Sequence, residues 1–175
     1  AVPIDTAYIY ANKKTNGLLM WNGLKIHTHM AVYKKDGKEY PAYCMNRELP
    51  GVEIGRSQTV DVKQLINNVM VWRAIINGYP YKSISELGCN TEEEAYLATK
   101  QAVYSILYNN DVDTYYRGGN ERGTKIFNAI KYMVNEGRYG TYTPESANVT
   151  VTKVGNLREE NNYYSQEYSV DARVN

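Results

Sequence analysis

Apolar and polar residues alternate through the first part of the chain and again through the last part. The clearest case is Leu24–Tyr33, whose even-numbered positions from 26 to 32 are Ile, Thr, Met and Val and face away from His27 and His29. This period of two predicts strands with one buried face. Asn-Gly pairs at 16–17 and 22–23, and Asp36-Gly37, indicate tight turns between them. The predicted strands are Tyr8–Tyr10, Leu18–Trp21, Leu24–Tyr33, Glu39–Asn46, Asn148–Val154 and Tyr163–Val174.

A helical period replaces this alternation in the middle of the chain. It predicts three main helices, at Val60–Asn77, Thr91–Asn109 and Glu121–Asn135. Asp61 is the expected N-cap of the first, and Gly137 the expected end of the third. The predicted fold class is therefore α+β, with β-sheet or sandwich-like elements from both chain ends packed with a helical middle.

The helix predicted at Thr91–Asn109 is apolar on nearly every side. It begins with a capping box, in which Thr91 and Glu94 each accept from the other's backbone N–H. A helix that is apolar nearly all round is usually buried. Gln101 would then carry a carboxamide into a crowded, mostly dry environment. For this helix alone, a core glutamine bonded to backbone is the simpler interpretation.

Length and charge restrict the class of protein. The 175 residues predict a single domain over 1–175, and the strand-like final residues suggest a fragment of a longer protein. A formal net charge of +1 gives no electrostatic reason to expect a nucleic-acid partner, and no apolar run is long enough for direct membrane insertion. Eighteen tyrosines against one phenylalanine suit a binding surface.

The chain has two cysteines, Cys44 and Cys89, and two histidines, His27 and His29. Neither cysteine has a His or Cys neighbour at metal-ligand spacing, so we expect no metal site and no cofactor. The histidines share a strand face, and we expect them to line a solvated or lightly covered surface.

Cys44 and Gln101 together offer a specific chemistry. A thiolate that attacks a side-chain carboxamide and expels ammonia leaves a thioester between Cys Sγ and Gln Cδ. This needs the two groups held in a near-attack arrangement and a neighbour that stabilises the oxyanion. Burial among aromatic side chains would keep water away from the product. From periodicity alone, this pairing is only one possibility.

Three stretches strengthen it by resemblance: Tyr43-Cys44-Met45, Gly78-Tyr79-Pro80 and Glu92–Tyr104. In order and character, residues 5 to 140 resemble the internal-thioester domains of Gram-positive bacterial surface adhesins. In that family an aromatic-Cys segment and a helix with a Thr-Gln-x-Ala-Ile/Val-Trp motif supply the two halves of the thioester. The resemblance implies a Cys44–Gln101 cross-link, with supporting or shielding roles for Tyr43, Met45, Thr99, Ala102 and Tyr104.

The resemblance also implies a function. The domain would lie on the bacterial surface, anchored to the cell wall through another part of its parent protein. Its thioester would react once with a lysine amine on a host cell-surface or extracellular-matrix protein. It would therefore form a covalent adhesive bond and would not turn over as an enzyme.

Two positions depart from the family motif. Tyr104 stands where the family has Trp, which keeps a large aromatic ring. A gapless match places Lys100 at the family's Gln and Gln101 at the variable position. Because an amine has no acyl carbon, Lys100 cannot form a thioester, and we assign the acyl group to Gln101. Loss of the thioester in this chain is the alternative.

Two further functions fit the same residues. A Cys44–Cys89 disulfide would make the chain a non-covalent surface binding or stalk module. A cysteine hydrolase would use Cys44 as nucleophile and His27 or His29 as base. The second is less well supported, because no third group that would orient the base is recognisable near them.

Overall fold

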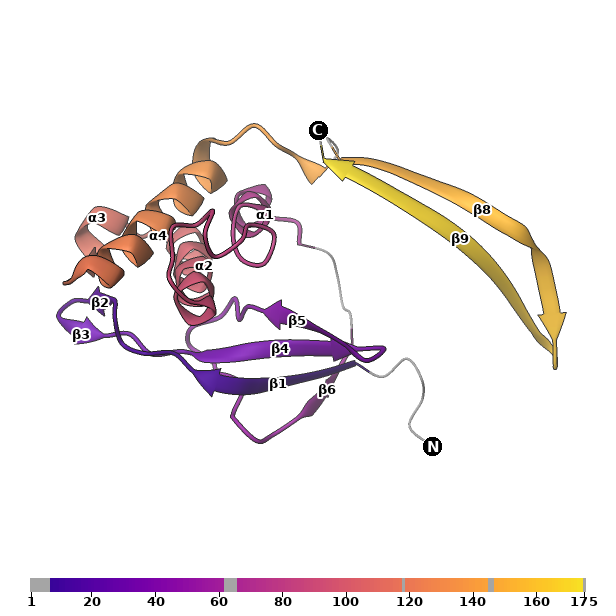
Figure 1. Cartoon of the computed structure of the whole chain (residues 1–175), viewed down its shortest axis with the longest axis horizontal. Helices are drawn as coiled ribbons and strands as arrows, with labels where there is room; N and C mark the ends of the chain where they lie inside the picture. The colour runs from indigo at the N-terminus through magenta and orange to yellow at the C-terminus, as the bar shows by residue number, and fades with distance from the viewer. Residues whose placement is uncertain (1–6, 62–65, 118, 145–146, 175) are drawn as a thin grey trace. The chain divides into compact units, whose positions relative to one another are not determined.

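The computed structural model describes residues 7–61, 66–117, 119–144 and 147–174. Its contacts divide the chain into two compact units, Ala1–Gly140 and Thr141–Asn175. Strands lie at both ends of the sequence and helices in the middle (Figure 1), which confirms the predicted α+β class. No helix in the described ranges is long and apolar enough to cross a bilayer.

The first unit contains a four-stranded antiparallel sheet of order β5-β4-β1-β6. The strands are β1 (Ala7–Lys14), β4 (His29–Lys35), β5 (Lys38–Ala42) and β6 (Gln58–Val60). A smaller sheet of order β3-β2-β7 joins β2 (Met20–Trp21), β3 (Leu24–Lys25) and β7 (Tyr116–Arg117). The strand predicted at Leu24–Tyr33 is thus two strands in different sheets. The break between them, residues 26–28, includes His27 and Thr28.

The helices gather on one side of the four-stranded sheet (Figure 1). They are α1 (Val69–Ile76), α2 (Glu92–Leu107), α3 (Val112–Tyr115) and α4 (Glu121–Tyr139). Helix α2 packs against both α1 and α4. It begins with the predicted capping box, and its buried positions lie on every side of the helix. Gln101 is buried as predicted, with 8% of its surface exposed.

Two helix boundaries differ from the prediction. Helix α1 begins at Val69 with Asn68 as N-cap, not at Val60 with Asp61, because Gln58–Val60 pairs with β1 as strand β6. The predicted positions 62–65 lie outside the described residues. Helix α4 continues past Gly137 to Tyr139. A Cβ on Gly137 would lie 2.5 Å from Cδ1 of Ile106, so this glycine permits close packing of α4 on α2 and does not end the helix.

The second unit is an antiparallel hairpin of β8 (Ala147–Glu160) and β9 (Tyr163–Val174). Both strands were predicted: β9 has the predicted bounds, and β8 is longer than the predicted Asn148–Val154. Asn161 and Asn162, with φ of 51° and 66°, form the turn, a backbone conformation that asparagine tolerates better than most residues.

Candidate functional site

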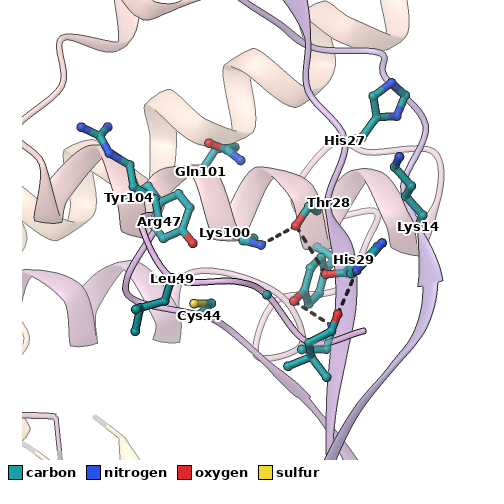
Figure 2. Close-up of a pocket in the computed structure, with 14 residues that line it drawn as sticks. Lys14, His27, Thr28, His29, Cys44, Arg47, Leu49, Lys100, Gln101 and Tyr104 are labelled. Atoms are coloured by element: carbon teal, nitrogen blue, oxygen red, sulfur yellow. Dashed lines mark hydrogen bonds between the residues drawn. The ribbon is translucent and has the colours of Figure 1, made fainter. Parts of the chain in front are cut away.

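A cavity of about 300 Å³ lies where α2 faces the start of β4 and the segment after β5 (Figure 2). Cys44, Lys100, Gln101 and Tyr104 all line it, together with both histidines. We call it the Cys44 pocket. The structure therefore brings the predicted thiol and the predicted carboxamide, 57 positions apart in sequence, into the wall of one cavity.

Tyr96 of α2 fixes the chain just before Cys44. Ala31 of β4 and Ala42 of β5 are paired residues in the sheet. The Tyr96 hydroxyl accepts from the Ala31 N–H at 3.0 Å and donates to the Ala42 carbonyl at 2.7 Å. A helix side chain thus bridges the last pair of this ladder, two residues before Cys44. This contact sets the position of the thiol relative to α2.

Tyr43 and Thr99, two of the predicted supporting residues, also help to hold the segment before Cys44 on α2. The ring of Tyr43 stacks on that of Tyr96, with centroids 4.7 Å apart, and its hydroxyl donates to the Tyr79 carbonyl at 2.5 Å. Thr99 accepts from the Tyr79 N–H at 3.0 Å, and a Cβ on Gly78 would lie 2.6 Å from Cγ2 of Thr99. The motif Gly78-Tyr79-Pro80 is therefore docked directly on α2.

Of the five predicted supporting residues, Tyr104 alone lines the pocket. Tyr43 and Thr99 instead contact Tyr96 and Tyr79, and Ala102 is fully buried in the core. Met45 is exposed, with 38% of its surface accessible, and does not line the pocket.

The Cys44 thiol is half-buried and free. Its Sγ donates to the Asn46 carbonyl at 3.2 Å. Burial, followed by hydrogen bonding to Cys44, raises the pKa of Tyr104. The phenol therefore stays protonated at neutral pH and available to a thiolate as a hydrogen-bond donor.

Lys100 lines the pocket with a partly buried side chain. Its Nζ donates to Oγ1 of Thr28, and it lies 5.7 Å from the Tyr104 ring centroid. Burial lowers the pKa of Lys100, while the negative charge of a Cys44 thiolate raises it. The Cys44 charge therefore opposes the effect of burial on the pKa of Lys100.

Gln101 has a different set of partners. Its Oε1 accepts from the Tyr116 hydroxyl at 3.1 Å, and Tyr116 in turn accepts from Oγ of Ser105 at 3.2 Å. No hydrogen bond between Cys44 and Gln101 is found among the described residues. Gln101 also lines a second cavity of about 160 Å³, whose wall includes Tyr116, and Arg47 and Tyr104 line both cavities.

Tyr116 was not among the residues predicted for the site. It lies in β7, between the helices predicted at Thr91–Asn109 and Glu121–Asn135, in a stretch where α3 and β7 form. No local pattern signals its role, because its partners are on α2. It is nevertheless the group best placed to polarise the Gln101 carbonyl.

Both histidines line the pocket, and each is held by its backbone surroundings. Nδ1 of His27 donates to the Thr15 carbonyl at 3.1 Å, and Nδ1 of His29 donates to the Val52 carbonyl at 2.8 Å. These bonds place the proton of the neutral ring on Nδ1. In the part of the chain that the structure describes, no three His, Cys, Asp or Glu residues are arranged to hold a metal ion.

Cys89 lies apart from this chemistry. It is buried in the helical core, and both cysteines are free thiols, so the alternative Cys44–Cys89 disulfide is not formed here. Burial, with a smaller contribution from the Glu94 charge, raises the pKa of Cys89 to about 11. Its thiol is therefore protonated and unreactive near neutral pH.

Comparison with known proteins defines the class. The family model described as "TED: Thioester domain" matches residues 41–138, which include Cys44, Gln101 and Tyr116. This span is more than half of the chain, and the chain belongs to the thioester-domain family.

Solved structures share this fold. The thioester domain of the Enterococcus faecium TIE86 protein superposes with a TM-score of 0.63 at 19% identity, covering 96% of this chain and 62% of that one. The Bacillus anthracis TIE protein superposes with a TM-score of 0.64 at 21% identity, covering 95% of this chain and 31% of that one. For the N-terminal thioester domain of the fibronectin-binding protein SfbI from Streptococcus pyogenes, the TM-score is 0.54 at 17% identity. The match covers 86% of this chain and 87% of that one. This chain thus spans less than two thirds of the length of the Enterococcus faecium and Bacillus anthracis structures. A search of curated proteins gave no match.

Proposed function

We propose that this chain is a covalent adhesion domain of a bacterial surface protein, and that Cys44 and Gln101 form its internal thioester. One observation carries the proposal. The Cys44 thiol and the Gln101 carboxamide line one pocket, and the carboxamide oxygen already accepts a hydrogen bond from Tyr116. Membership of the thioester-domain family supports it.

The pocket residues suggest a role for each group in bond formation. Lys100 and Tyr104 line the pocket with Cys44, so an ammonium and a phenol hydroxyl lie beside the attacking thiolate. Sγ attacks Cδ of Gln101, and negative charge develops on Oε1, where the Tyr116 hydroxyl already donates. The C–N bond then breaks, the departing amide nitrogen takes up a proton from solvent in place of the one that the thiol lost on becoming a thiolate, and ammonia leaves. The product is a thioester between Cys44 and Gln101.

Bond formation requires the thiol to approach the carboxamide. We expect the movement to come from the Cys44 segment. Residues 45–51 are all exposed, whereas the part of α2 around Gln101 is packed in the core. Tyr116 then keeps the Gln101 oxygen in place during the approach.

The thioester is a stored electrophile for a ligand amine. A lysine amine on a host surface or matrix protein attacks Cδ of Gln101, an isopeptide bond forms, and Cys44 leaves as a thiolate. The same Tyr116 and Lys100 contacts assist, because charge again develops on Oε1 and on Sγ. Each molecule reacts once. We place the chain on the cell surface of a Gram-positive bacterium, anchored to the wall through another part of its parent protein.

A second candidate is a thioester-free binding domain on the same scaffold. One contact favours it: Lys100, the residue at the family's Gln position, reaches into the pocket and donates to Thr28. In that case Cys44 remains a thiol and ligand binding is non-covalent.

Intact mass spectrometry of the native chain separates the two candidates. The covalent proposal requires a mass lower than the sequence mass by one ammonia. Methylamine treatment should add one methylamine at Gln101 and release one titratable thiol, and Cys44→Ala should show neither change. A full sequence mass with two titratable thiols would establish the second candidate.

A further inference from the structure

The Cys44 pocket is lined by basic residues and by no acidic ones. Lys14, Arg47 and Lys100 line it together with His27 and His29, and no described aspartate or glutamate is part of its wall. The whole chain carries 20 Lys and Arg against 19 Asp and Glu, so this imbalance is local. Like charges around one cavity repel one another, and an anion placed among them lowers that repulsion.

Among the residues that the structure describes, none of the three cations forms an ion pair with a carboxylate. Within the described ranges, the ion pairs are made by other basic side chains. Lys13, the sequence neighbour of Lys14, pairs with Glu92 and Glu93. Lys100 donates to a hydroxyl, and the Arg47 guanidinium lies 3.9 Å from the Tyr108 ring centroid. Stacking on an aromatic ring fixes the plane of Arg47 and leaves its N–H groups available for a carboxylate.

From this arrangement we infer that the pocket recognises an acidic side chain of a protein ligand, next to the lysine that reacts. This inference deepens the proposed function. A lysine that enters the pocket alone meets Lys14, Arg47 and Lys100 as like charges. A neighbouring glutamate or aspartate offsets that repulsion by pairing with Arg47 at the rim. The basic surroundings also favour the neutral, nucleophilic form of the entering amine.

The dimensions of the site favour one carboxylate over a polyanion. A cavity of about 300 Å³ is at the small end of ligand sites. A sulfated polysaccharide binds along an extended basic surface, and the chain as a whole is nearly neutral. A single acidic side chain beside a lysine matches both the volume and the charge.

Binding to the Cys44→Ala variant tests the recognition step without any thioester. The probes are two short peptides that differ in one residue, one with Lys-Glu and the other with Lys-Gln, and a heparin oligosaccharide as the polyanion. Binding is followed by NMR shifts of pocket residues. We expect the Lys-Glu peptide to bind at least tenfold more tightly than the Lys-Gln peptide, and Arg47→Gln to remove this difference.

Lys38→Gln is the matched control, because Lys38 is an exposed cation outside the pocket. It should leave the preference for Lys-Glu unchanged. Equal affinity for the two peptides, or a preference that survives Arg47→Gln, would overturn the inference. Pocket binding of heparin alone would overturn it in favour of a polysaccharide. Failure of the covalent proposal appears separately, as a full sequence mass in the native chain.

Discussion

The side chains of Lys100 and Gln101, adjacent on α2, form hydrogen bonds to different parts of the fold. Lys100 donates to Thr28, just before β4, whereas Gln101 accepts from Tyr116 in β7. One step along a helix turns a side chain by about 100°, so neighbours meet different surroundings. Both line the Cys44 pocket, but only Gln101 has an acyl carbon to offer Cys44.

Substitutions at these two neighbours should have different effects on intact mass. We expect Gln101→Ala to restore the full sequence mass, because the acyl donor is gone. Lys100→Met removes the charge, keeps an unbranched side chain that is one atom shorter, and leaves Gln101 intact, so the ammonia deficit should persist and form more slowly. A deficit that survives Gln101→Ala, or disappears only in Lys100→Met, would contradict the assignment to Gln101.

Tyr116→Phe should slow the reaction of the thioester with methylamine. The substitution removes the hydroxyl that donates to Oε1 of Gln101, and loss of one oxyanion donor typically costs about 10²- to 10³-fold in rate. The rate of thiol release measures the effect. Tyr132→Phe, which removes a hydroxyl bonded to Asn77 away from the pocket, is the control and should react at the wild-type rate.

Tyr96→Phe should lower both stability and the yield of thioester. The Ala31 N–H and the Ala42 carbonyl each lose a hydrogen-bond partner, and a buried unsatisfied group costs about 1–3 kcal/mol. Urea unfolding measures the first effect and intact mass the second. Tyr33→Phe in β4 should change neither, because the Tyr33 hydroxyl bonds to no described residue. Full thioester yield in Tyr96→Phe would remove Tyr96 from the positioning of Cys44.

The buried Cys89 should make stability depend on pH in alkaline solution. Burial raises its pKa from 9.0 to about 11, so between these values the folded chain keeps a proton that the unfolded chain releases. Stability falls with pH wherever the native state binds more protons. The free energy of unfolding should therefore decline from pH 9 to pH 11, and Cys89→Ala should decline less steeply. Parallel curves for the two proteins would contradict this account of Cys89.

Local sequence determined the elements whose causes are local. The capping box at Thr91 and Glu94 set the start of α2, and its apolar faces set its burial, because both depend on residues within a few turns. The alternation at both chain ends determined strands and the β8–β9 hairpin for the same reason. The pattern also placed Gln101 inside the core, whereas the strand predicted at Glu39–Asn46 ends at Ala42 and leaves Cys44 in the segment after it.

Only the tertiary structure decided how these parts meet. Strand β6 exists because Gln58–Val60 finds an edge on β1, and this pairing displaced the predicted start of α1. Tyr116 acquires its role from α2, and the basic pocket gathers Lys14, Arg47 and Lys100 from three separate segments. Hydrogen bonds and charges act through space at a few ångströms, so contacts between distant segments leave no periodic signal in the sequence.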